Sequence, residues 1–373
     1  MKLQLLAYAL SASACLIPSD SIPHSERAAV LAARQATRPE PDFPIGTGDR
    51  FKKGTIVPKG LSTSDRNLKS ILTPAEVSSA LEGLAKNFKE VELIRPPYKT
   101  YEGVKTLGAK IGKNPKFFII SGAHARERGG PDHVVYWLSD LLHARKAGKG
   151  LKYGKTTFTA AQVRKAVDGG VVVLPIINPD GVKFDQSTNS CWRKNRNPKS
   201  SKGNPDAIGI DINRNYDFLF NYKKAFNSGI DLSSVASEDP TSEVFHGTGP
   251  ESEPETKNVV WVMDKYKIQG VHHLQGHQRP KEGWQQHEEV HGERWYHQVR
   301  RARGCWSACG KSKLQSYTIE FGEESGSAAC PFYPSEKQYH MWMKQVASGL
   351  TEVALAAAET KPEVKKCAYP APK

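Results

Sequence analysis

The chain has 373 residues, of which 38% are hydrophobic and 25% are charged, a composition typical of soluble globular proteins and long enough for one large domain or two ordinary ones. Its formal net charge is +14, but Lys and Arg are scattered and cluster only mildly between residues 50 and 69. The charge therefore indicates a solvated basic surface. With no Arg-rich helix and no recognisable nucleic-acid module, we expect no nucleic-acid partner.

The N-terminus, residues 1–17, has the pattern of a secretory signal peptide. Lys2 supplies positive charge, Leu3–Leu10 is mostly apolar, and Ala12-Ser13-Ala14 is a plausible cleavage site. A disordered tail is the alternative interpretation. The apolar stretch is too short to cross a bilayer, and no later segment is apolar over the necessary length. We therefore expect a secreted, extracellular protein without a membrane span.

Export would permit disulfide bonds, and the sequence has six cysteines. Cys15 falls at the expected cleavage point, so an odd number remains in the mature chain: Cys191, Cys305, Cys309, Cys330 and Cys367. At least one thiol must then stay free or pair outside this set. Cys309 with Cys330 is the pair that we favour for a bridge.

Residues 18–70 are rich in Pro, Ser and charged residues and show little periodicity, so we expect a poorly ordered leader or pro-like segment. The folded domain is expected over residues 71–360, followed by a polar tail at 361–373. Its first helix is expected at Thr73-Pro74-Ala75-Glu76, because Thr73 can cap the helix, Pro74 suits the first turn and Glu76 completes a capping box.

Beyond this helix, the domain alternates strands and helices. The predicted strands are Val104–Ile111, Phe117–Ile120 and Val171–Ile177, and the predicted helices are Pro131–Ala144, Phe158–Val167, Ser252–Tyr266 and Glu336–Ala358. A second capping box, Ser252 with Glu255, is expected to open the helix that ends at Tyr266. The alternation favours an α/β domain in which helices cover a sheet.

The turn between the predicted strand at Phe117 and the helix at Pro131 contains His124 and Glu127. An imidazole and a carboxylate three residues apart at such a turn can approach a single point. Zinc accepts both ligand types, and a catalytic zinc needs a third ligand and an open position for water. The spacing alone is a weak signal, because a pair of this kind also arises by chance in ordinary surface turns.

Further polar residues lie in loops and in one strand. Arg193 follows Trp192, and Asn213 with Arg214 lies in a later loop. A guanidinium offers a fork of donors that suits a carboxylate, and Asn213 adds an amide donor. Glu320 lies in a β-like run, where a carboxylate is costly unless it is satisfied or functional. Taken singly, each of these residues could form an ordinary ion pair.

Together these segments resemble the zinc metallocarboxypeptidases related to carboxypeptidase A. The resemblance covers residues 73–263 and 314–359, and its motifs occur in the family's order: GAHARERGGPD, INPDGVKF, WRKNRNP, DINRN, FHGTGPESEPE and TIEFG. It implies a mixed, mostly parallel sheet of about eight strands flanked by helices. It also implies an active site at the carboxyl ends of the strands.

The resemblance assigns roles to the residues near the expected metal. His124 and Glu127 look like the first two ligands of one zinc ion, and Asp211 looks like the carboxylate that orients His124. Glu320 looks like the general base that takes a proton from water and returns it to the leaving amine. Arg193 looks like the residue that polarises the scissile carbonyl and stabilises its oxyanion.

The resemblance also implies how substrate is chosen. Asn213 and Arg214 look like the clamp for the terminal carboxylate of the substrate. An internal peptide bond has no carboxylate to pair with a buried Arg, so only the last bond would be presented. The implied protein is a secreted, monomeric, zinc-dependent carboxypeptidase that acts on peptides or proteins with a free C-terminus.

The family pattern fails from about Ile268 to Ala308, and residues 268–313 form an atypical or misread segment. In the family, a strand here delivers the third zinc ligand, a His followed by Ser, and later residues supply a mobile Tyr and the specificity pocket. Here, six of the 12 His fall between Val271 and Gly304, and branched aliphatic residues are few. Such a sequence is not expected to form a buried strand.

Three interpretations of this segment compete. One is that His272, His273 or His277 still supplies the third ligand. Another is that the protein is a degenerate relative without activity. The third, favoured by the abrupt change in composition, is a shifted reading frame or a retained intron. The alternative function is therefore an inactive carboxypeptidase-like binding protein that keeps Asn213 and Arg214.

Overall fold

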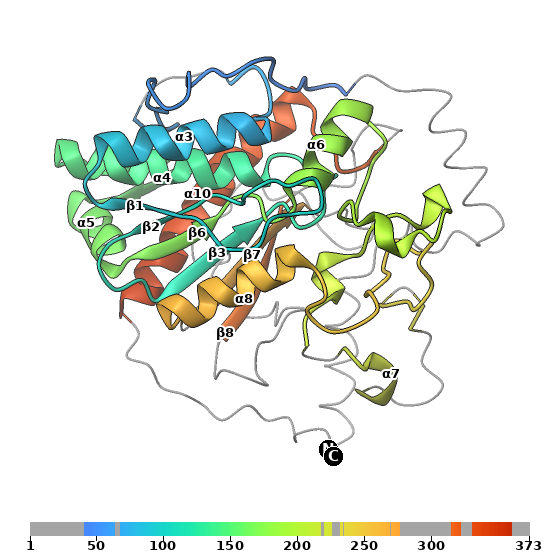
Figure 1. Cartoon of the computed structure of the whole chain (residues 1–373). Coiled ribbons are helices and arrows are strands. Elements are labelled where there is room, and N and C mark those ends of the chain that lie inside the picture. Colours follow the sequence, from blue (N-terminus) through green and yellow to red (C-terminus); the bar gives the residue numbers. More distant parts are fainter. Residues whose placement is uncertain are drawn as a thin grey trace.

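The computed structural model describes residues 41–63, 68–217, 220–225, 232–233, 235–268, 270–276, 315–321 and 330–359. In this part of the chain a central sheet lies between helices, so the predicted α/β class is confirmed (Figure 1). No helix within these ranges is both long and apolar enough to cross a membrane.

The central sheet is mixed. Its strands lie in the order β1 (Val91–Ile94), β2 (Gly108–Ile111), β6 (Val171–Leu174), β3 (Phe117–Ser121), β7 (Gly270–Gly276) and β8 (Gln315–Phe321). The last four are mutually parallel, whereas β1 and β2 pair antiparallel. The described sheet thus has six strands where about eight were expected. A separate hairpin is formed by β4 (Leu151–Tyr153) and β5 (Thr156–Phe158).

Helices cover both faces of the sheet (Figure 1). Four of them pack on one face, α3 (Pro74–Asn87), α4 (Gly130–Ala147), α5 (Ala160–Gly169) and α10 (Glu336–Glu359), and α8 (Pro254–Tyr266) packs on the other. Along β3, Phe117 and Ile119 join the first layer, and Phe118 and Ile120 pack with α8. Because both faces are covered, β3 is apolar at successive positions.

Shorter helical segments lie along the connection between β6 and α8. They are α6 (Pro179–Thr188), η2 (Pro198–Ser200), η3 (Pro205–Ala207), η4 (Ile212–Arg214) and α7 (Tyr222–Ala225). This connection contains Arg193, Asp211, Asn213 and Arg214, four of the polar residues that the sequence singled out.

One predicted capping box is confirmed and the other is wrong. At α3, Thr73 accepts a hydrogen bond from the Glu76 N–H, and Glu76 accepts one from the Thr73 N–H. At α8, the helix begins at Pro254 and its N-cap is Glu253, which makes no side-chain cap hydrogen bond. Ser252 Oγ instead donates to Glu253 Oε1 and accepts from Asn215 Nδ2. Contacts with loops, which sequence spacing does not show, have replaced the local motif.

The prediction that residues 268–308 contain no buried strand is wrong for residues 270–276. These residues form β7, which lies between β3 and β8, parallel to both. Ile120 lies opposite His273, and His273 is buried despite its polarity. Pairing with a strand on each side overrides the low intrinsic β-propensity of this sequence.

The packed structure begins before residue 71. Residues 41–63 fall in the segment expected to be poorly ordered, yet Phe43 and Phe51 are buried in a cluster with α3 and α4 side chains. The backbone N–H groups of residues 61–63 donate to the carboxylate of Asp140 in α4. This stretch therefore forms part of the domain surface.

Three predicted boundaries also shift. The strand expected at Val104–Ile111 covers only Gly108–Ile111, and the strand that begins at Val171 ends at Leu174 rather than Ile177. The helix expected from Phe158 begins at Ala160, because Phe158 ends β5 and the capping box of the helix begins one residue later. Short neighbouring elements are hard to separate by periodicity alone.

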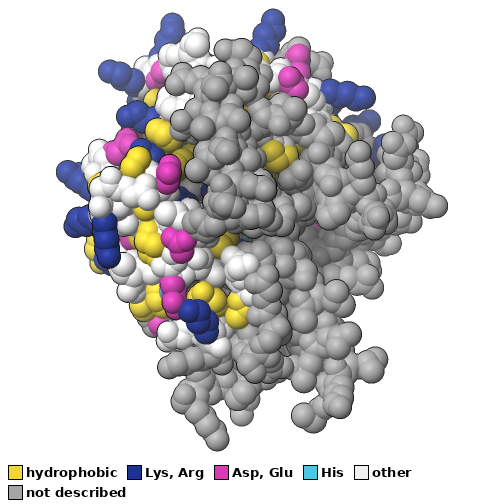
Figure 2. All heavy atoms as spheres, turned by 90° about the vertical axis from the view of Figure 1, so that its right-hand side faces the viewer, with side chains coloured by type: hydrophobic (Ala, Val, Ile, Leu, Met, Phe, Trp, Pro, Cys, Tyr) yellow, Lys and Arg dark blue, Asp and Glu magenta, His cyan; other side chains and the backbone are white. Residues whose placement is uncertain are grey.

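Lys and Arg side chains are dispersed over the described surface. On the face shown in Figure 2 they alternate with acidic, apolar and other polar groups, without a continuous basic stripe over the described residues. Several pair locally with carboxylates, as Lys110 does with Glu92 at 2.5 Å and Lys223 with Glu238 at 2.7 Å.

Candidate functional site

The site lies at the carboxyl end of β3, where the chain turns toward α4. The turn passes through Gly122, whose φ is +61°. A Cβ at this position would lie 3.3 Å from the Cα of Ile176, so glycine allows the loop after β3 to pass close to the loop after β6. The residues that follow, His124 to Glu127, are consequently buried.

His124 lies between two carboxylates, and all three side chains are buried. Its Nδ1 is 2.6 Å from Glu127 Oε1, and its Nε2 is 3.2 Å from Asp211 Oδ1. If Nε2 carries the proton and donates to Asp211, Nδ1 presents a lone pair to Glu127. Two acceptors in such contact require a proton or a metal cation between them.

Asp211 joins His124 to Arg193. Its Oδ2 accepts hydrogen bonds from Arg193 Nε at 3.0 Å and Nη2 at 2.8 Å. Burial alone would raise the pKa of Asp211, but the charges of Arg193, His124 and Arg214 hold it well below its ordinary value. One ionised carboxylate therefore orients both an imidazole and a guanidinium.

His273, one of the three candidates for the third ligand, lies near this pair. Its ring centre is 6.3 Å from that of His124, with the ring planes inclined at 51°. Burial lowers the pKa of His273 to about 4, with the charge of His124 acting in the same direction. The ring is thus neutral at physiological pH, the form in which histidine binds metals.

The side chains at this site are of the types that zinc binds. Within the described ranges, no three His, Cys, Asp or Glu side chains already form a cluster that could hold a metal ion. However, two imidazoles and a carboxylate are a donor set that zinc binds. Glu127 Oε2 and His273 Nε2 are buried without a hydrogen-bond partner among these residues, as unused ligand atoms would be. Completing the set requires His273 to approach the His124–Glu127 pair.

The two residues of the expected carboxylate clamp follow Asp211 directly. Asn213 is buried, its N–H donates to Asp211 Oδ1 at 2.9 Å, and its Oδ1 has no hydrogen-bond partner within the described ranges. Arg214 is half-buried, and its Nη1 donates to the Asn213 carbonyl at 3.2 Å while its Nε donates to the carbonyl of Val235. The structure brings both residues beside the Asp211–Arg193 pair.

Glu320 lies near the carboxyl end of β8. Its backbone is opposite Gln275, two register steps beyond the pair of His273 and Thr318. The side chains of Glu320 and His272 lie outside what the structure describes, as does all of His277. The role of Glu320 as general base therefore stays a prediction, placed at the same edge of the sheet as His273.

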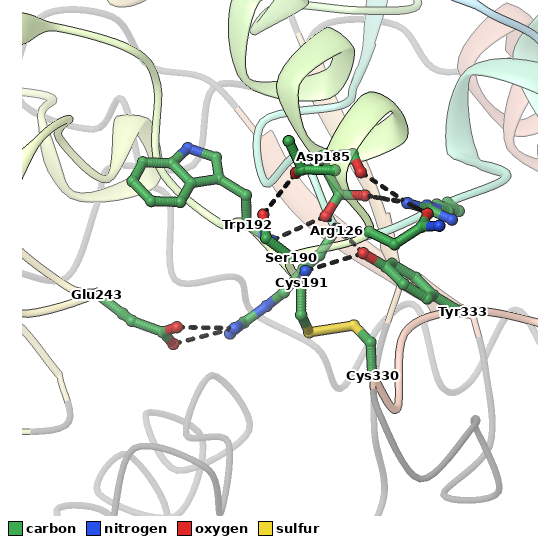
Figure 3. The surroundings of a disulfide bond; sticks show 11 residues. Arg126, Asp185, Ser190, Cys191, Trp192, Glu243, Cys330 and Tyr333 are labelled. Atoms are coloured by element: carbon green, nitrogen blue, oxygen red, sulfur yellow. Dashed lines mark hydrogen bonds and ion pairs between the residues drawn. A yellow bond between two sulfur atoms is a disulfide. The ribbon is translucent and has the colours of Figure 1, made fainter. Parts of the chain in front are cut away.

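A disulfide joins Cys191 to Cys330, across 139 positions of sequence (Figure 3). The favoured pair of Cys309 with Cys330 is therefore wrong, and Cys309 itself lies outside the described residues. Sequence distance misled the choice, because the loop that precedes Arg193 folds onto the segment before α10. The bridge connects the two.

Asp185 organises the same loop (Figure 3). Its Oδ1 accepts hydrogen bonds from the Tyr333 hydroxyl at 2.7 Å and from the Trp192 N–H at 2.8 Å. The Cys191 N–H donates in turn to the Tyr333 hydroxyl at 2.9 Å. These contacts fix the backbone immediately before Arg193. No motif in the sequence pointed to Asp185 or Tyr333, which meet only through the fold.

Two arginines that flank Glu127 also escaped notice. Arg128 forms a buried ion pair with Asp185, at 2.8 Å between Nη2 and Oδ2, and lies 3.5 Å from the ring centre of Tyr333. Arg126 Nη1 donates to both carboxylate oxygens of Glu243, at 3.1 and 3.0 Å. Their position beside a proposed metal ligand was a signal that both would be buried and paired.

The chain matches a family of known proteins over most of its length, and individual relatives over about half of it. The sequence model of the zinc carboxypeptidase family matches residues 78–351. Carboxypeptidase A4 of Mus musculus is 33% identical over 156 residues, which are 41% of this chain and 31% of that protein. Carboxypeptidase O of Homo sapiens is 27% identical over 218 residues, which are 57% of this chain and 51% of that protein. The chain thus spans a third to a half of these relatives.

Solved structures share the fold. Thrombin-activatable fibrinolysis inhibitor superimposes with a TM-score of 0.54 at 19% identity, covering 83% of this chain and 82% of that one. Carboxypeptidase A from Helicoverpa armigera gives 0.53 at 18% identity, covering 78% and 75%. At such identities the likeness concerns the fold, and the match over residues 78–351 is what decides the family. This chain belongs to the zinc carboxypeptidase family.

Proposed function

We propose that this protein is a secreted, zinc-dependent carboxypeptidase that hydrolyses the C-terminal bond of peptides or proteins. The observation that carries the proposal is the buried assembly after β3, in which His124 contacts Glu127 and Asp211 binds both His124 and Arg193. The disulfide between Cys191 and Cys330 supports secretion, because such bonds persist in oxidising compartments. We expect the protein to act as a monomer.

In this proposal, His124, Glu127 and His273 hold the zinc. When bound, zinc polarises a carbonyl and lowers the pKa of a bound water toward ~7. Asp211 contacts Nε2 of His124, which leaves Nδ1 as the nitrogen for the metal. The neutral state of buried His273 suits it to the same task.

Glu320 and Arg193 carry out proton transfer and oxyanion stabilisation, and Asp211 orients Arg193. Glu320 takes a proton from the attacking water and later gives it to the leaving amine. Arg193, oriented by two hydrogen bonds to Asp211, stabilises the oxyanion of the tetrahedral intermediate. Since Asp211 stays ionised throughout the neutral range, the orientation of Arg193 does not depend on pH there.

Asn213 and Arg214 recognise the terminal carboxylate of the substrate. A guanidinium and an amide together offer several donors to the two carboxylate oxygens. A substrate without a free C-terminus would cover the half-buried guanidinium of Arg214 without supplying an anion to pair with it, which is costly. Because Arg214 also bonds to Val235, we expect substrate binding to be coupled to the position of that loop.

Metal analysis of the purified protein, combined with release of the C-terminal residue from N-blocked dipeptides, tests the proposal. We expect one zinc per chain and hydrolysis that a chelator abolishes and added zinc restores. Glu127→Ala should lose the zinc, whereas Glu320→Ala should keep it and lose turnover. Equal zinc content and equal activity in all three proteins would contradict the assignment.

A second candidate is an inactive binding protein that retains the carboxylate clamp. It is favoured by one observation: the described residues hold no ready-made cluster of three metal ligands. It predicts a protein that retains no zinc but binds a peptide with a free C-terminus and rejects the same peptide as a C-terminal amide. Zinc retention together with turnover excludes it.

A further inference from the structure

A single buried residue, Glu253, contacts both loops that carry the proposed substrate-binding residues. Its carboxylate binds the loop of Arg193, and its backbone N–H binds the loop of Arg214. Glu253 precedes α8 and is 1% exposed. Glu253 is the N-cap residue of α8, but its side chain makes no cap hydrogen bond to the first turn, unlike the Ser, Thr, Asp and Asn that usually occupy this position. Its carboxylate binds Asn195, Asn197 and Ser252 instead.

On one side, Glu253 binds the loop of Arg193. Its Oε2 accepts from Asn195 Nδ2 at 2.7 Å and from Asn197 Nδ2 at 3.0 Å, and its Oε1 accepts from Asn197 Nδ2 at 3.2 Å. The side-chain oxygen of each of these two amides accepts hydrogen bonds from backbone N–H groups. Asn195 Oδ1, for example, accepts from the Ile210 N–H at 2.8 Å. The orientations of both amides are thereby fixed, with their donors facing Glu253.

On the other side, Glu253 binds the loop of the clamp through Asn215, which follows Arg214. The Glu253 N–H donates to Asn215 Oδ1 at 3.1 Å. Ser252 Oγ donates to Glu253 Oε1 at 2.8 Å and accepts from Asn215 Nδ2 at 2.9 Å. A Cβ at Gly247 would lie 2.9 Å from Asn215 Nδ2, so this amide is also enclosed on its far side.

We propose that Glu253 is a positioning residue that sets the distance between Arg193 and the clamp of Asn213 and Arg214. This inference rests on the proposed function. A substrate whose scissile carbonyl meets Arg193 and whose carboxylate meets Arg214 spans both loops with a single residue. Asp211 links the two loops beside the reacting groups, and Glu253 links them through the side chains of Asn195, Asn197 and Asn215. Misplacement by about 1 Å can lower the rate of such a reaction about 100-fold.

The neighbouring buried carboxyl group of Glu255 offers a matched control. It too accepts from Asn195 Nδ2, at 3.2 Å, but its hydrogen bonds within the described ranges do not include the loop of Arg214. Burial raises the pKa of Glu255 to about 8, so at pH 7 it is mostly protonated. Replacing it with Gln therefore changes little charge. The two substitutions each remove a carboxyl group, two positions apart, but only that of Glu253 also binds Ser252, which binds Asn215 in the loop of Arg214.

The test compares wild type, Glu253→Gln and Glu255→Gln on two N-blocked substrates. One is an ordinary dipeptide, and the other has a β-amino acid at its C-terminus, which moves the carboxylate one methylene further from the scissile carbonyl. We expect Glu253→Gln to lower kcat/KM for the ordinary dipeptide by roughly 10- to 100-fold. Both kcat and KM should change, while zinc content stays the same. The preference for the ordinary dipeptide over its homologue should also shrink, a change that simple loss of stability would not produce.

Glu255→Gln should stay within about threefold of wild type in kcat/KM and keep the same preference. If Glu253→Gln leaves kcat/KM and the preference as in wild type, or if both variants alter them equally, the inference is overturned. Should Glu253→Gln fail to fold, Asn197→Ala replaces it, because it removes donors to Glu253 on the Arg193 side alone. It should lower kcat more than it raises KM, and an unchanged kcat overturns the inference.

Failure of the proposed function would look different. In that case wild type itself would retain no zinc and hydrolyse neither substrate. The preference is then read from the dissociation constants of the same two compounds. Loss of that preference in Glu253→Gln, and not in Glu255→Gln, supports the positioning role even in a protein that only binds. An unchanged preference in Glu253→Gln overturns it.

Discussion

Strands β3 and β7 lie side by side, parallel and in register, yet their compositions are opposite. In β3 every residue is buried and the sequence is FFIIS, whereas β7 reads GVHHLQG. The register places Ile120 opposite His273. The comparison teaches that an apolar run predicts a strand, but a polar sequence does not exclude one when strands on both sides complete its hydrogen bonds.

The two strands also supply the site differently. We call residues 121–128, Arg193 and residues 211–214 the β3 side, and residues 270–276, 315–321 and 330–333 the β7–β8 side. The β3 side is internally connected, because Asp211 binds both His124 and Arg193. The described part of the β7–β8 side offers one imidazole whose ring centre is 6.3 Å from that of His124. In the proposed enzyme, the zinc is held by ligands from both sides.

Removal of one histidine from each side has the largest expected effect. We expect both His124→Ala and His273→Ala to lose zinc on dialysis and to show no detectable hydrolysis, because a catalytic zinc needs three protein ligands. His143→Ala is the control. It removes a partly buried histidine of α4 that contacts the Pro58 carbonyl, and it should keep both the zinc and the activity. Zinc retained by His273→Ala would show that His273 is not the third ligand, and the contribution assigned here to β7 would be wrong for this residue.

Glu320→Gln tests the end of the neighbouring strand. As a general base, Glu320 should contribute about 10²- to 10⁴-fold to kcat, so the Gln variant should lose that much while keeping its zinc. The measurement is single-substrate kinetics with metal content determined on the same sample. Loss of zinc would instead place Glu320 among the ligands, and unchanged kcat would remove it from the reaction.

Local signals predicted the β3 side well. The capping box of Thr73 and Glu76 and the apolar run at Phe117 are short-range patterns, and both were found where expected. The loops that carry His124, Glu127 and Asp211 follow such elements, so their approach could be anticipated. Their functional roles came from the family's motif order, since spacing alone could not distinguish a metal ligand from an ordinary ion pair.

The β7–β8 side could not be predicted in the same way. Its central strand depends on pairing with β3 and β8, far apart in sequence. The bridge from Cys191 to Cys330 and the contacts of Glu253 with Asn195 and Asn215 are equally non-local. For such contacts, residue type indicates only that a partner is needed, because the fold decides which partner it is.

The disulfide joins the two sides covalently, so its removal measures how strongly they support each other. Cys191 lies just before Arg193, and Cys330 follows β8. The double variant Cys191→Ser, Cys330→Ser should lose about 2–5 kcal/mol in the free energy of unfolding, as removal of a native bridge typically does. Denaturant titration of the oxidised proteins provides the measurement. Cys309→Ser is the comparison, and an equal loss there would mean that Cys330 pairs with Cys309 in solution.

A further prediction concerns a buried carboxyl group between α4 and α10, whose effect depends on pH. Asp132 of α4 accepts hydrogen bonds from Tyr339 of α10 at 2.5 Å and from the Leu72 N–H at 2.9 Å. Burial raises the pKa of Asp132 to about 7 from an ordinary value of 3.8, although the charge of Arg50 opposes the rise and that of Glu76 adds to it. The folded state therefore binds this proton more tightly than the unfolded state does.

The free energy of unfolding that Asp132 contributes depends on pH. The contribution of Asp132 is fully present below about pH 4 and is lost as the pH rises toward 7, with a slope of at most ~1.4 kcal/mol per pH unit. Asp132→Asn keeps the acceptor oxygen and removes the titration, so its stability relative to wild type should increase between pH 4 and 8. Denaturant unfolding at several pH values measures the difference. Parallel curves for the two proteins would mean that Asp132 is ionised in the folded state, and that α4 and α10 meet across a charged carboxylate.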